Sequence, residues 1–346
     1  MKLVTFTADA TGVEQRVGVL HGQVVVDPLA VLYADYLAHG AEVSDAARRA
    51  AVEAPRNMVA IFALEDSGAM ALNKALEIAD RASENGDELR GPGGEAAVLP
   101  TTEVRLLAPV PRPPRIRDYL TYEGHAAGGG LALPEAFSEM PICYKCNVDS
   151  VIGPEDEIVW PAYSQQLDYE LEIGFYVSRP GRNFTVEEAA RSIAGVTIFN
   201  DVSARDIQMR EMSLTIGPSK GKDFCTVMGP CVVTMDEIDE WNIELIARVN
   251  GEVWSEGTSA GRRFSFGEVL AWASYCENVQ PGEFLALGTV GGGCGYELDR
   301  WIKPGDVVEL SSPQIGVLRN PVGAPEHVPD GAGLASYHGS PRAKAH

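Results

Sequence analysis

The segment LDYELEIGFYV carries three carboxylates at alternating positions, Asp168, Glu170 and Glu172. Side chains of a β-strand point alternately to opposite faces, so in a strand these three acids share one face. Carboxylates two residues apart stand roughly 6–7 Å from each other, and at an effective dielectric of about 20 each pair repels by about 2–3 kcal/mol. On a wet surface the repulsion falls below about 1 kcal/mol, so a solvated strand face is the plain alternative to a functional site.

Further residues of the same chemistry accompany this pattern. The run VTIFND ends in Asp201, RDYLTYEGH contains Asp118 and His125, and polar Gly-rich segments supply Arg205 and Lys222. Clustered acids cannot all stay ionised without a cation or a shared proton. Ligands made only of oxygen favour a hard ion, Mg²⁺, Mn²⁺ or Ca²⁺, over zinc. The pattern therefore predicts a divalent metal site built from carboxylates.

The composition restricts what such a site could serve. The chain has 346 residues, 45% of them hydrophobic, and a formal net charge of −21. This charge repels phosphate backbones, which argues against nucleic acid as a partner. An anionic substrate needs local positive charge, from a metal or from a few Arg and Lys side chains. No apolar run reaches the roughly 18 residues of a membrane span, and no signal-peptide pattern opens the sequence, so a cytoplasmic protein without a membrane partner is expected.

The cysteines do not suggest a second chemistry. Six cysteines form no disulfide framework in a chain of this length. Cys143 and Cys146 make a C-x-x-C, but a second pair at zinc-binding spacing and a thioredoxin-like context are both missing. We interpret these two residues as reduced, structural thiols.

The elements that must position the site change in character along the chain. Residues 1–30 alternate like a hairpin-like pair of strands with a turn at Asp9–Gly12, and residues 41–83 interleave apolar and charged positions as helices do. A charged, Gly-rich loop at 84–96 and a proline-rich connector follow. From about Ile116 the sequence consists of many short strand-like runs separated by Gly, Pro and Asp turns.

Two helices interrupt those strands. Thr185 with Glu188, and Ser265 with Glu268, have the spacing of capping boxes at helix starts. The pattern as a whole predicts an α+β, β-rich fold. Its expected parts are a smaller α/β N-terminal domain over residues 1–110, a larger domain over 115–322, and a C-terminal tail over 323–346 that is poor in large apolar residues.

Seven segments, taken in order, resemble the fumarylacetoacetate hydrolase family: RDYLTYEGH, PICYKC, QLDYELEIG, NDVSARDIQ, GPSKGKDF, LALGTVGGGC and GDVVEL. Each motif is weak alone, but seven in sequence over most of the second domain are specific. The resemblance implies a catalytic domain of mixed β-sheets, a sandwich-like roll with a few helices. The N-terminal part resembles the smaller leading domain of the longer members. The resemblance also implies a homodimer.

The resemblance assigns roles to individual positions. The family's metal ligands match Asp118, Glu170, Glu172 and Asp201. Its general base matches His125, the acid that orients this base matches Glu297, and a catalytic lysine matches Lys222. The positions that match substrate-binding residues are Tyr144, Arg205, Gln208 and Thr289. Asp168 shares the acidic face and is expected to support the site rather than bind the ion.

Two positions depart from the family pattern. The hydrolase that defines the family has a substrate-binding Tyr where this chain has Leu120, so a different substrate pocket is expected. The shorter acylpyruvase-like members have a Glu three residues after the base, where this chain has Gly128. A His–Glu pair is therefore expected with Glu297.

Together with the carboxylate pattern, the resemblance implies a divalent-metal-dependent hydrolase, with Mg²⁺ favoured and Mn²⁺ or Ca²⁺ as alternatives. It would cleave a carbon–carbon bond in a small anionic diketo acid of the fumarylacetoacetate or acylpyruvate type, in the catabolism of aromatic or related compounds. The alternative is a decarboxylase, isomerase or hydratase of the same family that acts through a metal-stabilised enolate. A third interpretation is a metal-stabilised binding protein without turnover.

Overall fold

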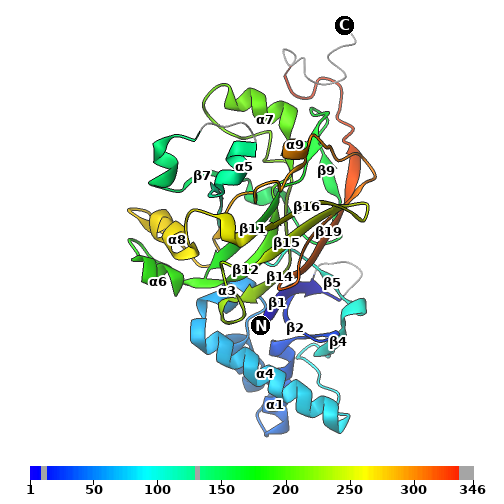
Figure 1. The fold of residues 1–346 in the computed structure, drawn as a ribbon. Coiled ribbons are helices and arrows are strands. Elements are labelled where there is room, and N and C mark those ends of the chain that lie inside the picture. The colour runs from blue at the N-terminus through cyan, green and yellow to red at the C-terminus, as the bar shows by residue number, and fades with distance from the viewer. Residues whose placement is uncertain (9–13, 129–132, 335–346) are drawn as a thin grey trace.

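The computed structural model describes residues 1–8, 14–128 and 133–334. Within these ranges strands dominate, several sheets are formed, and the helices are short except in the N-terminal part (Figure 1). The expected α+β, β-rich fold is confirmed. The turn expected at Asp9–Gly12 lies outside the described residues.

The N-terminal elements follow the sequence pattern. Strands β1 (Lys2–Thr7) and β2 (Arg16–His21) pair antiparallel, and β2 turns into β3 (Val24–Val26). The helices that follow are α1 (Pro28–Ala38), α2 (Val43–Glu53), α3 (Met58–Ala63) and α4 (Glu65–Asn85). Asp27 is the N-cap of helix α1, and its side chain accepts a 3.0 Å hydrogen bond from the Ala30 N–H. Helix α4 ends at Gly86 with φ of 76°, a conformation that glycine adopts without strain.

The largest sheet joins N-terminal and later strands. Its further members are β4 (Val98–Pro100), β5 (Arg105–Leu106), β6 (Ile116–Leu120), β7 (Ile142–Lys145), β8 (Val151–Ile152), β11 (Leu171–Val177), β12 (Ile193–Asn200), β14 (Thr226–Thr234) and β17 (Phe284–Ala286). Their order is β4-β3-β2-β1-β14-β12-β11-β17-β6-β7, with β5 beside β1 and β8 beside β14. Because β1 pairs with β14, the N-terminal strands extend the sheet that carries the acidic segment. The division into domains at 110–115 stays a prediction.

A second sheet covers part of the first. It consists of β9 (Ile158–Trp160), β15 (Glu244–Val249), β16 (Glu252–Thr258), β18 (Val307–Ser312) and β19 (Gly316–Pro325), in the order β16-β15-β18-β19-β9. One hydrophobic cluster includes Ile173 and Val196 from the first sheet and Leu245 and Leu310 from the second. Shared burial of this kind holds two packed layers together. Strand β19 continues to Pro325, beyond the expected domain end, and residues 335–346 of the tail lie outside the described ranges.

Short elements surround the acidic segment. Strands β10 (Leu167–Asp168) and β13 (Ser203–Ala204) pair with each other, and helices α5 (Glu123–Gly128), α7 (Arg205–Met212) and α9 (Gly295–Leu298) lie at the end of the molecule away from α1 and α4 (Figure 1). Helices α6 (Val186–Ala190) and α8 (Phe266–Ser274) begin with the two predicted capping boxes, which are confirmed. Short 3₁₀ helices span Thr101–Glu103, Glu135–Ser138, Val148–Ser150, Met235–Glu237 and Ser259–Gly261.

The six cysteines are all free, in agreement with the interpretation of Cys143 and Cys146 as thiols. Within the described ranges, every helix is too short or too polar to cross a bilayer.

Candidate active site

Four carboxylates meet in the interior, although they come from three strands. Asp118 lies in β6, Glu170 directly precedes β11, Glu172 lies in β11, and Asp201 directly follows β12. One ligand oxygen from each lies within 4.8 Å of the others. Their relative exposures are 5%, 4%, 0% and 0% in that order, so the alternative of a solvated strand face is wrong.

Burial makes this cluster electrostatically expensive. Desolvation, with repulsion from the neighbouring acids, raises the pKa of Asp118 and Glu172 well above the ordinary range, and desolvation also raises the pKa of Asp201. Burial opposes ionisation of Glu170 too, but Lys222 and Arg205 outweigh it and hold the pKa of that carboxyl below its ordinary value. Ionisation of all four acids is therefore unfavourable unless a cation offsets their charge.

The unpaired oxygens of the cluster test whether a metal ion fits. Asp118 Oδ1, Glu172 Oε2 and Asp201 Oδ1 are buried, and none has a hydrogen-bond donor among the residues that the structure describes. A buried acceptor without a donor costs free energy, and most such atoms in proteins are satisfied. Three orphaned carboxylate oxygens within one cluster are accounted for by a hard divalent cation, which takes oxygen ligands. The four carboxylates therefore fit a divalent metal ion.

Two buried cations flank the acids. Lys222 Nζ lies 2.5 Å from Glu170 Oε2 and 2.5 Å from Asp201 Oδ2. Arg205 donates through Nη2 to Glu170 Oε1 at 2.7 Å and through Nη1 to Gln208 Oε1 at 2.9 Å. The sequence predicted both cations near the metal site, and the fold brings them into direct contact with its carboxylates.

Asp168 connects this cluster to helix α9. Its Oδ2 accepts a 2.8 Å hydrogen bond from Arg205 Nε, and the Gly295 and Tyr296 N–H groups donate to its two oxygens at 2.7 and 3.0 Å. Asp168 is thus held by Arg205 and by the first N–H groups of α9, and it lies outside the group of four carboxylates whose oxygens come within 4.8 Å of one another, which suits a supporting residue.

Two predicted substrate-binding residues touch the acids directly. The Tyr144 hydroxyl, on β7 opposite Asp118 of β6, donates a hydrogen bond to Asp201 Oδ2. The Thr289 hydroxyl donates to Glu172 Oε1 at 2.9 Å. These bonds orient carboxylates of the cluster, whatever further contacts the two hydroxyls make with a substrate.

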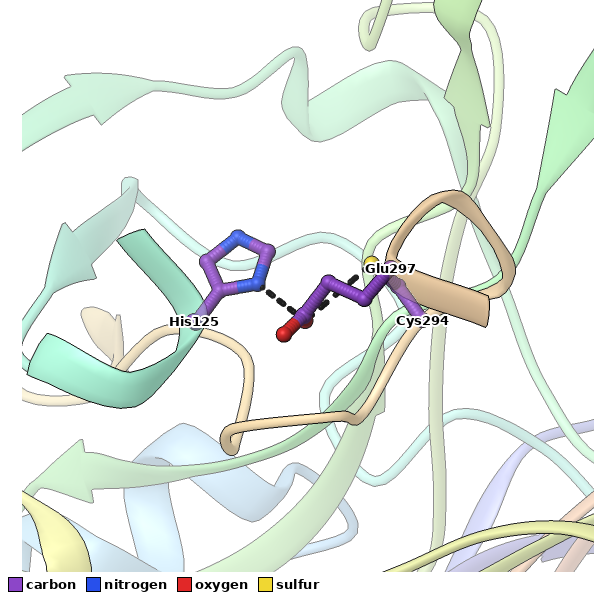
Figure 2. A group of neighbouring side chains, drawn as sticks. All are labelled: His125, Cys294 and Glu297. Atoms are coloured by element: carbon purple, nitrogen blue, oxygen red, sulfur yellow. Dashed lines mark hydrogen bonds and ion pairs between the residues drawn. The ribbon is translucent and has the colours of Figure 1, made fainter. Parts of the chain in front are cut away.

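A His–Glu pair lies beside the carboxylate cluster, and Figure 2 shows its two side chains pointing toward each other. His125 Nδ1 lies 2.7 Å from Glu297 Oε1, while His125 Nε2 is 3.9 Å from Glu170 Oε1. A carboxylate accepts and cannot donate, so we assign the imidazole proton to Nδ1, which leaves the Nε2 lone pair facing the cluster. The predicted contact between His125 and Glu297 is present.

Gly128 provides the space for that pair. A Cβ built on Gly128 would lie 2.1 Å from Glu297 Oε2, a contact that no side chain tolerates. A larger residue at position 128 and the observed position of Glu297 exclude each other. The glycine at 128, which departs from the family pattern, is therefore what allows Glu297 to pair with His125.

Sequence reasoning missed the residues that hold Glu297. The Gly292 N–H donates to its Oε2 at 2.9 Å, and Cys294 Sγ lies 3.4 Å from its Oε1. The ligand atoms of His125, Cys294 and Glu297 lie within 4.8 Å of one another. Burial, with the charge of Asp168 second, raises the pKa of the Cys294 thiol, so this group is a neutral hydrogen-bond donor. The spacing C-x-x-E, equal to that of the two capping boxes, was the available signal.

A sequence model described as "Fumarylacetoacetate (FAA) hydrolase C-terminal" matches residues 115–323, more than half of the chain and all the carboxylates of the cluster. The chain belongs to the fumarylacetoacetate hydrolase family. Among its relatives within the family is the human mitochondrial oxaloacetate tautomerase FAHD2A, 33% identical over 236 residues that cover 67% of this chain and 74% of the relative. An uncharacterized protein of Archaeoglobus fulgidus is 33% identical over 64% of this chain and 83% of its own length. The cytoplasmic location of this chain stays a prediction.

Solved structures of the fumarylacetoacetate hydrolase fold agree over almost the whole chain. The fumarylacetoacetate hydrolase of Exiguobacterium antarcticum has a TM-score of 0.66 and 26% identity, covering 94% of this chain and 99% of the other. A maleylpyruvate hydrolase from Sphingobium, solved with manganese(II) and pyruvate, has a TM-score of 0.64 and 21% identity, covering 94% and 100%. At that lower identity the second match shows the shared fold.

Proposed function

We propose that the chain is a divalent-metal-dependent tautomerase of a small 2-oxo dicarboxylic acid, of the oxaloacetate type. The proposal rests on the His125–Glu297 pair. His125 Nε2 faces a buried carboxylate cluster suited to a divalent metal ion. A base placed there can remove a proton from the carbon next to a 2-oxo group and return it to oxygen. The 33% identity to a protein named oxaloacetate tautomerase supports this reaction.

Asp118, Glu170, Glu172 and Asp201 would hold the cation. Mg²⁺ is our first choice, with Mn²⁺ or Ca²⁺ as alternatives, and the manganese(II) in the Sphingobium hydrolase structure supports a divalent ion. When bound, the cation would act as a Lewis acid toward the 2-oxo acid and offset negative charge on its oxygens.

The chain's own residues supply the proton transfer. The substrate's C–H proton passes to His125 Nε2, its electron pair becomes the new carbon–carbon double bond, and the former carbonyl oxygen takes the negative charge. Glu297 stabilises the resulting imidazolium through Nδ1. His125 Nε2 then returns the proton to that oxygen, while Nδ1 stays on Glu297. Lys222 and Arg205 offset the charge of the surrounding acids, so an anion can enter a protein with a net charge of −21.

The second candidate is the carbon–carbon hydrolase on a small diketo acid. It is favoured by the buried carboxylate on Nδ1, since that arrangement also activates a water molecule by general base catalysis. The 26% identity to a fumarylacetoacetate hydrolase supports it further, and a role in aromatic catabolism would follow from it. Decarboxylation or hydration through the same enolate would use the same groups.

A substrate panel with purified protein and Mg²⁺ separates these reactions. Tautomerisation of oxaloacetate is followed by absorbance of the enol, cleavage of acylpyruvates by product analysis, and decarboxylation by CO₂ release. We expect tautomerisation that His125→Ala reduces by about 10²- to 10⁴-fold, while the exposed His39, at the end of α1, serves as the control in His39→Ala. Cleavage without tautomerisation would favour the hydrolase, and no turnover at all would favour the binding protein.

The predicted homodimer has its own test. Light scattering coupled to size exclusion should give twice the chain mass of 37.1 kDa, and a monomer at micromolar concentration would contradict the prediction.

A further inference from the structure

Among the described residues, three helices begin with the same spacing, a small N-cap residue followed three positions later by Glu. At α6 the hydroxyl of the N-cap Thr185 accepts a hydrogen bond from the Glu188 N–H at 3.2 Å. At α8 the hydroxyl of the N-cap Ser265 accepts one from the Glu268 N–H at 3.1 Å. In return, the Glu188 carboxylate accepts hydrogen bonds from the Thr185 N–H and hydroxyl, both at 2.9 Å. The Glu268 carboxylate accepts hydrogen bonds from the Ser265 N–H at 2.7 Å and hydroxyl at 2.8 Å. Each closes a reciprocal capping box.

Helix α9 has the spacing without the box. Its N-cap is Cys294, in the extended conformation of an N-cap residue with φ of −138° and ψ of 158°, and Glu297 occupies the third helical position. No cap hydrogen bond from the Cys294 side chain is formed. Glu297 points instead toward His125, with the Cys294 thiol on its Oε1 at 3.4 Å (Figure 2). The backbone thus permits a capping box that the side chains do not make.

Sulfur explains the difference. A thiol is a weak acceptor and a weak donor, so Cys294 neither caps the Glu297 N–H well nor competes strongly for the carboxylate. A hydroxyl does both, as Thr185 and Ser265 show in this same chain. The 3.4 Å contact of Cys294 is also longer than the 2.8–2.9 Å hydroxyl contacts in the boxes.

We propose that Cys294 is a positioning residue that keeps the Glu297 carboxylate on His125 by withholding a capping box. This inference rests on the proposed role of His125 as the base. It assigns Cys294 a function through Glu297, without contact to substrate, and it makes a prediction that a packing role does not make. The chemically closest replacement, Cys294→Ser, should damage the site more than Cys294→Ala.

Two variants, Cys294→Ser and Cys294→Ala, test the proposal, with Cys276→Ser as a matched control because Cys276 is exposed. In Cys294→Ser the introduced hydroxyl should close the box, draw the Glu297 carboxylate to the N-cap N–H, and lower kcat by about tenfold or more with KM unchanged. In Cys294→Ala only the weak S–H bond is lost, so kcat should fall by no more than about threefold. The pH profile of kcat should change shape in Cys294→Ser and keep its shape in Cys294→Ala.

Structural measurements decide the question without turnover. Crystal structures of Cys294→Ser and Cys294→Ala should show the carboxylate moved in the first and retained on His125 in the second. The low-field NMR signal of the His125 Nδ1 proton should be weakened only in the first. A Cys294→Ser structure with Glu297 still on His125, or a variant order with Ala below Ser, overturns the proposal. If the wild-type protein has no turnover but the carboxylate has moved in the Cys294→Ser structure, the proposed function is overturned and the positioning role of Cys294 stands.

Discussion

Replacement of Glu297 by glutamine tests whether this carboxylate sets the tautomer of the base. Glu297 Oε2 accepts a 2.9 Å hydrogen bond from the Gly292 N–H, and Oε1 lies 2.7 Å from His125 Nδ1. In the variant the amide oxygen must keep the place beside Gly292, since an amide nitrogen cannot accept a hydrogen bond there. The amide NH₂ therefore faces Nδ1 and donates to it.

That reversal moves the imidazole proton to Nε2, the nitrogen that faces the carboxylate cluster. The base then presents an N–H where it needs a lone pair. The same reversal in the Ser-His-Asp triad lowers kcat by about 10⁴-fold. The His125 side chain is 18% exposed, so solvent can help the ring to exchange tautomers, and we expect a smaller loss of about 10³-fold. This corresponds to about 4 kcal/mol of transition-state stabilisation.

Steady-state kinetics on wild type, Glu297→Gln and Glu123→Gln measure the effect. Glu123 is the matched control, because it lies on the same helix as His125, is exposed, and loses the same charge. Calorimetry with Mg²⁺ should give one affinity for all three proteins, since neither residue belongs to the carboxylate cluster. A loss of less than tenfold in Glu297→Gln at unchanged metal affinity would refute the tautomer argument.

Further predictions follow from the packing and charge of the site. Gly128→Ala places a methyl group 2.1 Å from the observed position of Glu297 Oε2, so kcat should fall at least about tenfold. The Tm should hold or rise, because alanine is the better helix former. Full activity of the variant would contradict the close contact. Glu170→Gln combined with Glu172→Gln should weaken Mg²⁺ binding at least about 100-fold by calorimetry, and unchanged affinity would place the metal elsewhere. Burial raises the pKa of Asp118 and Glu172, so the folded, metal-free protein binds protons that the unfolded chain releases. Its Tm in EDTA should therefore fall as the pH rises above the ordinary carboxylate range of about 4, and Mg²⁺ should remove that slope; a Tm that rises with pH in EDTA would contradict it.

Strand periodicity predicted much of the fold around the site. The alternation in LDYELEIGFYV correctly placed the acids on one side of the strand, where Arg205 bonds to both Asp168 and Glu170, while Tyr169 and Leu171 between them lie in the hydrophobic core. The capping boxes at Thr185 and Ser265 were correct because they depend on neighbours only three residues apart. The same alternation could not show that the acidic face is buried, since the residues that cover it lie far away in the chain.

Local patterns could not show which contacts form where distant segments meet. Asp168 and Glu172 look alike in the sequence, yet both oxygens of Asp168 accept hydrogen bonds from Arg205 or the start of α9, while Glu172 Oε2 has no donor among the described residues. The N-terminal strands look like a separate unit, but β1 pairs with β14 and joins them to the sheet of the site.

The sequence by itself determined the chemistry that is available: a run of alternating acids, a histidine after an aspartate, and two cationic side chains. The tertiary structure decided how those groups are used. Glu297 is 172 residues from His125, and only the fold sets their 2.7 Å contact, through the space at Gly128 and the donors Gly292 and Cys294. The physical reason is that burial and hydrogen bonding, which fix protonation and partner, depend on distances between segments that no local spacing contains.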